Sequence, residues 1–146
     1  MNDLKLLGRK QIGMGGRKVL SLRYPIAWWL PGFCFLVLVA TGSLIPAGGV
    51  ITGFEHADKL VHAFSYFILT VWFTGLYAKG KGKKIAFFLV CFGVLLEFIQ
   101  ARLPYRFFDP LDLVANTVGI AFGLFLSAIA LGGWCQRVEV FLGNHD

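Results

Sequence analysis

Charged residues are scarce in this chain. They make up 15% of its 146 residues, whereas a soluble domain of ordinary composition carries roughly 25%. Hydrophobic residues make up 57%, and they fall in long blocks. The scarcity of charge argues against an ordinary soluble domain, and the long apolar blocks predict an integral membrane protein.

The chain also lacks the short motifs of several common enzyme classes. It contains no G-x-S-x-G, no H-E-x-x-H and no P-loop sequence, so these signatures of hydrolases, zinc proteases and nucleotide-binding enzymes are absent. The three cysteines, Cys34, Cys91 and Cys135, have no metal-like spacing and lie in or beside apolar blocks. We expect them to be small core residues rather than disulfide partners or metal ligands.

Four apolar blocks are long enough to cross a membrane as helices. The predicted spans are Ile26 to Ile45, Leu60 to Tyr77, Ile85 to Ala101, and Asp109-Pro110 to Leu131. The first block exceeds the roughly 7–15 apolar residues of a signal peptide, so we interpret it as an uncleaved span. The predicted fold is therefore all-α, an integral membrane four-helix bundle over residues 25–132, with tails at 1–24 and 133–146.

Smaller features of these segments leave alternatives open. Trp28 and Trp29 suit a membrane interface, and Pro31 either begins the first regular helix or kinks it. Residues 1–24 form either a basic tail, which we favour, or an amphipathic arm on anionic lipid. In the C-terminal tail, Val138 to Leu142 could lie on the membrane.

The distribution of basic residues predicts the orientation of the bundle. The formal net charge is +6, and most Lys and Arg residues lie in Lys5 to Arg23 and Lys79 to Lys84. Short-loop basic residues favour the cytoplasmic side of a membrane. Only Lys59, Arg102 and Arg106 belong to the other two loops and their flanks. Both termini are therefore predicted to be cytoplasmic, and no nucleic-acid partner is expected.

Most of the costly polar side chains gather at the outer ends of the last three spans. Asp58, His62 and Tyr66 follow one another at helical spacing, and Asp109-Pro110 resembles a helix start with Asp109 as N-cap. Polar groups within an apolar helix are expensive unless they are partnered. We expect one candidate polar cluster, formed by Asp58, His62, Tyr66, Glu97, Gln100, Arg106, Asp109, Asp112 and Asn116.

Within this cluster, Glu97 is expected to pair with Arg106 or His62. Arg106 is the more natural partner, because a guanidinium can bind a carboxylate with two parallel hydrogen bonds. His62 with Asp58 is either an oriented base, a metal-ligand pair or a hydrogen bond at a helix start. Whether the carboxylates hold a metal stays open, and no cofactor is predicted. Away from the cluster, the G-x-x-x-G of Gly119 and Gly123 predicts close helix packing.

Three polar motifs on successive spans resemble those of a known family. They are D-K-L-V-H-A-F-S-Y-F at 58–67, E-F-I-Q at 97–100 and R-F-F-D-P-L-D-L-V-A-N-T-V-G at 106–119. Together they resemble the VanZ-like family of small bacterial membrane proteins, over about residues 30–130. The resemblance implies a four-helix protein of the bacterial cytoplasmic membrane. The family is named for a member linked to teicoplanin resistance.

Three functions follow as expectations. The first is a cell-envelope protein whose outward-facing polar pocket binds an anionic lipid or envelope-precursor head group. The second is a small membrane enzyme acting on a lipid-linked substrate, with Glu97 or His62 as base. The third is a structural subunit whose polar cluster fixes the helix arrangement. In each case the expected partners are membrane lipids.

Overall fold

The computed structural model describes residues 22–45, 57–77 and 80–143, which form helices joined by short connections. The elements are α1 (Pro25–Leu44), α2 (Ala57–Gly75), α3 (Gly82–Gln100), α4 (Pro110–Leu126), the π-helix η1 (Ser127–Leu131) and α5 (Trp134–Gly143). The all-α prediction is confirmed. The loop between α1 and α2 and most of the N-terminal basic segment lie outside the described residues.

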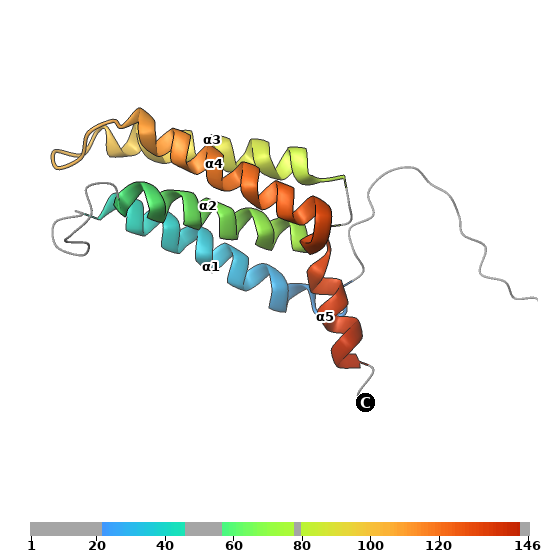
Figure 1. Ribbon diagram of the computed structural model, residues 1–146. Coiled ribbons are helices and arrows are strands. Elements are labelled where there is room, and N and C mark those ends of the chain that lie inside the picture. Colours follow the sequence, from blue (N-terminus) through green and yellow to red (C-terminus); the bar gives the residue numbers. More distant parts are fainter. Residues whose placement is uncertain (1–21, 46–56, 78–79, 144–146) are drawn as a thin grey trace, which may run out of the picture.

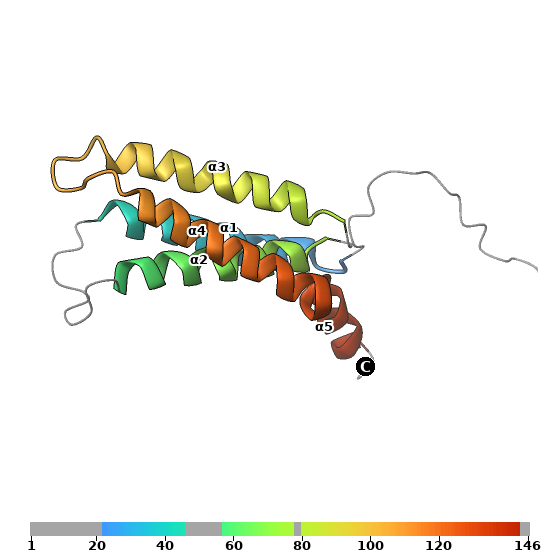
Figure 2. The ribbon, with the colours of Figure 1, turned by 45° about the horizontal axis from the view of Figure 1, so that its top comes forward.

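Helices α1 to α4 run along one common direction, and each runs opposite to the one before it (Figure 1). The largest contact joins α2 to α4, while α3 packs on α4 and α2, and α1 packs on α2 and α3. After η1 the chain turns, so α5 leaves the bundle at an angle in both views (Figure 2).

The bundle has two chemically different ends. At one, which we call the polar end, lie the end of α1, the start of α2, the 101–109 connection and the start of α4 (Figure 1). At the other, the basic end, lie the start of α1, the start of α3 with Lys81, Lys83 and Lys84, and η1 with α5. Every polar residue of the predicted cluster belongs to the polar end or to the helix turns leading from it.

Local sequence sets the helix starts. Asp109 caps α4, since its carboxylate accepts from the backbone N–H of Leu111 at 2.9 Å, and Pro110 occupies the first turn as predicted. Helix α1 begins at Pro25, and Pro31 lies inside the helix rather than at its start. Proline lacks an N–H and is tolerated best in the first turn of a helix. Pro25, and not Pro31, therefore begins α1.

Close packing between α2 and α4 depends on the two predicted glycines. A Cβ on Gly119 would overlap the Ala63 carbonyl oxygen, and one on Gly123 would lie 2.7 Å from Thr70 Cβ. Both glycines are buried. The absence of side chains therefore lets the two backbones approach, as the G-x-x-x-G spacing predicts.

The interior of the bundle holds polar as well as apolar side chains, and large apolar side chains cover much of its exterior. The buried polar residues are Ser43, Thr70, Thr74, Glu97, Gln100, Asp112, Asn116 and Ser127. Exposed apolar side chains lie on five of the helical segments and include Phe33, Phe64, Phe87, Phe98, Phe122 and Ile129. In water this distribution would leave large apolar areas uncovered.

Among the described residues, two stretches are long and apolar enough to cross a membrane, judged by length and composition. They are α1, Pro25–Leu44, with 20 residues, and the continuous stretch Pro110–Gly143, with 34 residues. Helix α2 has Asp58, Lys59 and His62 in its first two turns, and α3 has Lys83 and Lys84 in its first. Such residues lower the apolar character of α2 and α3 at their ends.

The cysteine prediction is wrong for two of the three residues. Cys135 is buried, but Cys34 and Cys91 are exposed, and all three are free. The reason is that the exposed surfaces of α1 and α3 also carry many large apolar side chains. An apolar environment in this bundle does not imply burial.

The C-terminal segment folds onto the bundle instead of forming a tail. Glu139 on α5 accepts from the backbone N–H groups of Arg23 and Tyr24, at 2.6 and 3.0 Å, and from Trp28 Nε1 at 2.8 Å. Trp134 Nε1 donates to the Val71 carbonyl at 3.1 Å. Helix α5 thus closes the start of α1, where the first N–H groups have no partner within their own helix.

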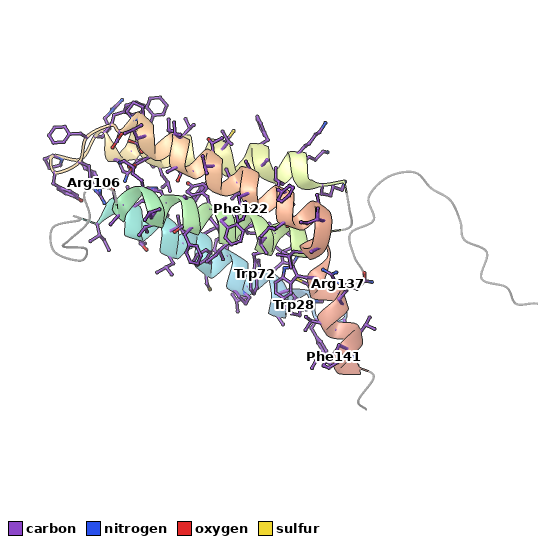
Figure 3. The ribbon with its side chains drawn as sticks, in the orientation of Figure 1. Trp28, Trp72, Arg106, Phe122, Arg137 and Phe141 are labelled. Carbon is purple, nitrogen blue, oxygen red and sulfur yellow. The ribbon has the colours of Figure 1, made fainter. Side chains whose placement is uncertain are left out.

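Three tryptophans support this closure. The rings of Trp28, Trp72 and Trp134 lie within 5.3 to 6.3 Å of one another, centre to centre. Trp28 and Trp72 lie near the basic end, beside α5 (Figure 3). Trp28 is therefore half-buried in an aromatic cluster, whereas its neighbour Trp29 is exposed.

Candidate functional site

Lys59 is the centre of the polar end. Its Nζ donates to Asp58 at 2.8 Å, to Asp112 at 2.6 Å and to Asp109. These carboxylates come from the first turn of α2, the first turn of α4 and the N-cap of α4. All three ammonium hydrogens are therefore committed, and Lys59 ties the start of α2 to the start of α4.

His62 extends the network one turn deeper. Its Nδ1 lies 3.2 Å from Asn116 Oδ1, and its Nε2 lies 3.6 Å from Asp112 Oδ2. Because an amide oxygen only accepts, the first contact assigns a hydrogen to Nδ1. His62, Asp112 and Asn116 therefore form a contiguous interhelical group, as the shared helix faces predict, while Asp58 contacts Lys59 rather than His62.

Glu97 is buried, and its partner differs from the predicted one. Its Oε1 accepts from the backbone N–H of Asp109 at 2.6 Å. The expected pair with Arg106 is wrong, because Arg106 Nη2 donates instead to the Ile45 carbonyl at 3.0 Å. The connection between α3 and α4 turns the guanidinium toward the end of α1 and brings a backbone donor to Glu97. Arg106 is labelled at this end in Figure 3.

Two other residues join the polar end to α1. Gln100 is buried, and its Nε2 donates to the Ser43 carbonyl at 2.7 Å. Tyr105 donates its hydroxyl to the Leu44 carbonyl at 3.1 Å. Together with Arg106, they donate to carbonyls at the C-terminal end of α1. These carbonyls have no N–H donor within the helix itself. Gln100 thus belongs to this α1 contact rather than to the Lys59 group.

Tyr66 lies deeper than the rest of the cluster. Its side chain is 1% exposed, so it lies inside the bundle rather than at a membrane interface, where tyrosine is often found. Its hydroxyl has no hydrogen-bond partner in the part of the chain that the structure describes. A Cβ on Gly93 would lie 3.1 Å from both the Tyr66 hydroxyl and the Asn116 amide nitrogen. Gly93 therefore leaves room for two polar groups between α2, α3 and α4.

Charge at the polar end is unbalanced. Three carboxylates surround the single ammonium of Lys59, and Glu97 lies beside Asp109. Hydrogen bonding from Lys59 holds the pKa of Asp109 below its usual value, so this carboxylate is ionised at neutral pH. The acid excess favours cations, or ligands that bring a cation with them, close to Lys59.

The geometry of the three aspartates resembles a cation site in one respect. Oxygens of Asp58, Asp109 and Asp112 lie within 4.8 Å of one another. However, Lys59 Nζ is within hydrogen-bond distance of all three. The ammonium thus stands where a metal would bind, and a divalent ion could occupy that place only after Lys59 had moved away.

The connection between α3 and α4 carries exposed aromatic and basic side chains. Tyr105, Phe107 and Phe108 are exposed, and Phe107 is 87% exposed. Arg102 is also exposed, and Arg106 Nε is buried without an acceptor among the described residues. Aromatic rings beside arginines are typical of segments at a membrane–water interface. We call residues 101–109 the aromatic loop.

Sequence reasoning missed the central role of Lys59. It counted Lys59 only as a basic residue of an outer loop, although the residue directly follows Asp58 and precedes His62 by less than one turn. That adjacency was the available signal, because a lysine next to predicted cluster residues at a helix start shares their depth. The partners on α4 could not be read from spacing within α2.

Comparison with known proteins places the chain near one curated relative. The chain is 38% identical over 76 residues to a Schizosaccharomyces pombe protein described as uncharacterized, covering 49% of this chain and 47% of the relative. The chain thus matches about half the length of that relative. No family profile matches the chain, and no solved structure matches it.

Proposed function

We propose that this chain is a multi-pass membrane protein that binds the phosphate-bearing head group of a lipid or envelope precursor at its polar end. In this proposal α1, α2, α3 and α4 with η1 are the four spans, and the basic end faces the cytoplasm. The motif resemblance to the VanZ-like family supports the bacterial cytoplasmic membrane as its location.

The observation that carries the membrane assignment is the combination of buried polar residues with large apolar side chains on the exterior. Glu97, Asp112 and Asn116 are buried, whereas phenylalanines on the same helices are exposed. A hydrocarbon solvent stabilises this distribution, since apolar side chains face lipid and polar ones find partners between helices. Basic residues at one end and exposed aromatics at the other suit two membrane interfaces.

The aromatic loop supports an anionic head group as the ligand. Lys59 cannot serve as its receptor, because all its hydrogens are committed to carboxylates. Arg106 and Arg102 remain, and the buried Nε of Arg106 lacks an acceptor among the described residues. Guanidinium groups bind phosphate with paired hydrogen bonds. The carboxylate network then has the role of holding α2, α4 and the loop in place.

A structural role is the second candidate, and the saturation of Lys59 favours it. A network whose donors are already satisfied can fix the helix arrangement without any ligand. The two proposals differ in what a ligand does to stability. Binding raises the stability of the folded state by about 2.7 kcal/mol at a ligand concentration of 100 times Kd, whereas a structural network responds to no ligand.

A matched pair of lipids separates these functions. The full chain, purified in a neutral detergent, is melted with a polyprenyl phosphate and with the corresponding polyprenol, which differs only by the phosphate. We expect the phosphate alone to raise the melting temperature. The rise should disappear in R102Q combined with R106Q and persist in K84Q, which removes a cation at the basic end.

Two outcomes would overturn head-group binding. One is an equal shift with polyprenol, which would indicate that only the chain is bound. The other is an undiminished shift in the double arginine variant. Absence of any shift in the wild type, together with a lower melting temperature of E97Q, would instead establish the structural role.

A further inference from the structure

A second candidate site lies at the basic end, far from the polar cluster. A pocket of about 430 Å³ opens between the end of α2, the start of α3 and the α4–η1 junction. Its volume falls within the range of small-molecule sites, roughly 300–1,000 Å³. Its lining includes Lys81, Lys83, Ile85, Leu124 and Ala128.

The backbone around the pocket departs from regular helix on two sides. Gly80 has φ 102°, a conformation that side chains disfavour, and it sets the turn into α3. On the facing side, Ser127–Leu131 is a π-helix, a form that is rare and frequent at functional sites. Together with Gly82 and Gly132, which lack side chains, these irregular segments leave space in the packing.

Positive charge at the pocket has no acidic partner. Lys81 is half-buried and Lys83 is exposed, and neither forms an ion pair with a residue that the structure describes. The lining contains no Asp or Glu, and the ion pairs found in the described ranges gather around Lys59 and His62 at the other end. A half-buried lysine without a carboxylate favours an anionic ligand.

The interior of the pocket is mainly apolar, and the hydroxyls of its two buried polar residues, Thr74 and Ser127, are hydrogen-bonded. Ile85 is buried, and Leu124 and Ala128 belong to the opposite wall. The Thr74 hydroxyl lies 2.6 Å from the Ser127 hydroxyl and also donates to the Thr70 carbonyl. A ligand therefore finds hydrocarbon inside and cationic donors at the lysines, which is the pattern of an amphiphile with an anionic head.

We infer that this pocket binds an anionic phospholipid of the leaflet at the basic end. The phosphodiester lies against Lys81 and Lys83, and the upper part of one acyl chain lies against Ile85, Leu124 and Ala128. A phosphate without a chain would leave this apolar wall uncovered. The site is independent of head-group binding at the polar end, since it uses other residues, the opposite leaflet and another lipid.

Native mass spectrometry of the full chain in neutral detergent tests this inference. The dissociation constant of the first bound lipid is measured for phosphatidylglycerol and for phosphatidylcholine with the same acyl chains. Each lysine near an anionic head group contributes about fivefold to affinity, so K81Q combined with K83Q should weaken phosphatidylglycerol binding roughly thirtyfold. Phosphatidylcholine carries the same phosphodiester together with a choline cation, so it should bind more weakly to the wild type and lose less affinity in this variant.

Three comparisons complete the experiment. K84Q removes a lysine from the same turn that does not line the pocket, and it should bind phosphatidylglycerol like the wild type. A128F keeps both lysines but fills the apolar wall, and it should weaken binding on its own. Glycerol phosphate, which lacks acyl chains, should not compete at the lipid concentration used.

Several results would overturn the site. Equal losses in K84Q and in the double variant would reduce it to general surface charge. Unchanged binding in A128F would remove the acyl chain from the pocket. Effective competition by glycerol phosphate would make it a site for free phosphate esters. If circular dichroism shows that the double variant does not fold, the test rests on A128F, which keeps both lysines. Unchanged phosphatidylglycerol binding in A128F would then overturn the site.

Discussion

At the scale of single residues, one ammonium group determines how the polar end is organised. Lys59 is 18% exposed and contacts three carboxylates, of which Asp112 is the most buried. Bringing these negative charges together is unfavourable without a cation between them. The three aspartates can therefore share one site only because Lys59 lies between them.

Replacing Lys59 should destabilise the fold, and K59M keeps most of its length without the charge. Removing one partner of a buried ion pair costs roughly 3–5 kcal/mol, and the exposure of Asp58 and Asp109 reduces that figure here. Melting in neutral detergent should show a loss well above that of K84M, a matched change at an exposed lysine.

Adding D112N to K59M should restore part of the lost stability, because it removes the most buried of the stranded carboxylates. Strictly additive losses in the double variant would contradict the electrostatic role of Lys59. They would assign its effect to packing of the aliphatic chain instead.

Residue positions within helices were predictable here, whereas partners across a loop were not. The sequence predicted that His62, Asp112 and Asn116 belong to one polar cluster, and the structure brings them together. The Glu97–Arg106 pair was reasonable by chemistry alone. It failed because the backbone path from 101 to 109 decides where the guanidinium points, and helical periodicity says nothing about that path.

At the scale of elements, the α2–α4 contact holds the bundle together. Two glycines of α4 lie against α2, where even a methyl group would meet the Ala63 carbonyl or the Thr70 side chain. Close backbone approach increases packing between helices in lipid, where burial of apolar surface gives little advantage. The seam between α2 and α4 should therefore tolerate very little added volume.

The substitution G119A tests the seam with a single methyl group. It should lower the melting temperature in detergent, because overpacking costs typically 1–3 kcal/mol and the obstacle is backbone. The control is G42A on α1, where no atom lies within 4 Å of the added Cβ. In a helix this control should be neutral or slightly stabilising.

Unchanged melting in G119A would mean that α2 and α4 can separate at no cost, contrary to the proposed seam. A loss in G42A equal to that in G119A would show that both reflect something other than the contact with Ala63.

Helices could be predicted where neighbouring residues determine them, and not where they depend on contacts with residues far away in the sequence. The Asp109-Pro110 start of α4 and the glycine spacing are local patterns, and both are confirmed. The helix at Trp134–Gly143 was expected to be tail, because its sequence alone is short and only weakly apolar. It is ordered by Glu139 and Trp134, whose partners lie more than 60 residues earlier.

At the scale of the whole molecule, the two ends of the bundle differ in the side chains that they carry. Lys81, Lys83 and Lys84 lie at the basic end together with the start of α1 and with α5 (Figure 1). The aromatic loop lies at the other end. The orientation remains a prediction from the bias of basic residues toward the cytoplasm, and it would put both termini and the lysines inside the cell.

Thiol labelling of intact bacterial cells tests this orientation. In a background with Cys34, Cys91 and Cys135 replaced by serine or alanine, a cysteine at position 81 should resist a membrane-impermeant maleimide until the cells are opened. A cysteine at position 107, whose side chain is largely exposed in the aromatic loop, should react from outside. The reverse pattern would invert the bundle and both proposed lipid sites.

The hydrogen bonds of Glu139 also have a consequence for the timing of biosynthesis. Its carboxylate accepts from Arg23, Tyr24 and Trp28, which precede it by 111 to 116 residues. A chain is synthesised from its N-terminus, so these three donors are made long before their acceptor. Helix α1 therefore acquires these bonds only after α2, α3 and α4 have been synthesised. A product released before Trp134 contains an α1 whose start still lacks the Glu139 acceptor.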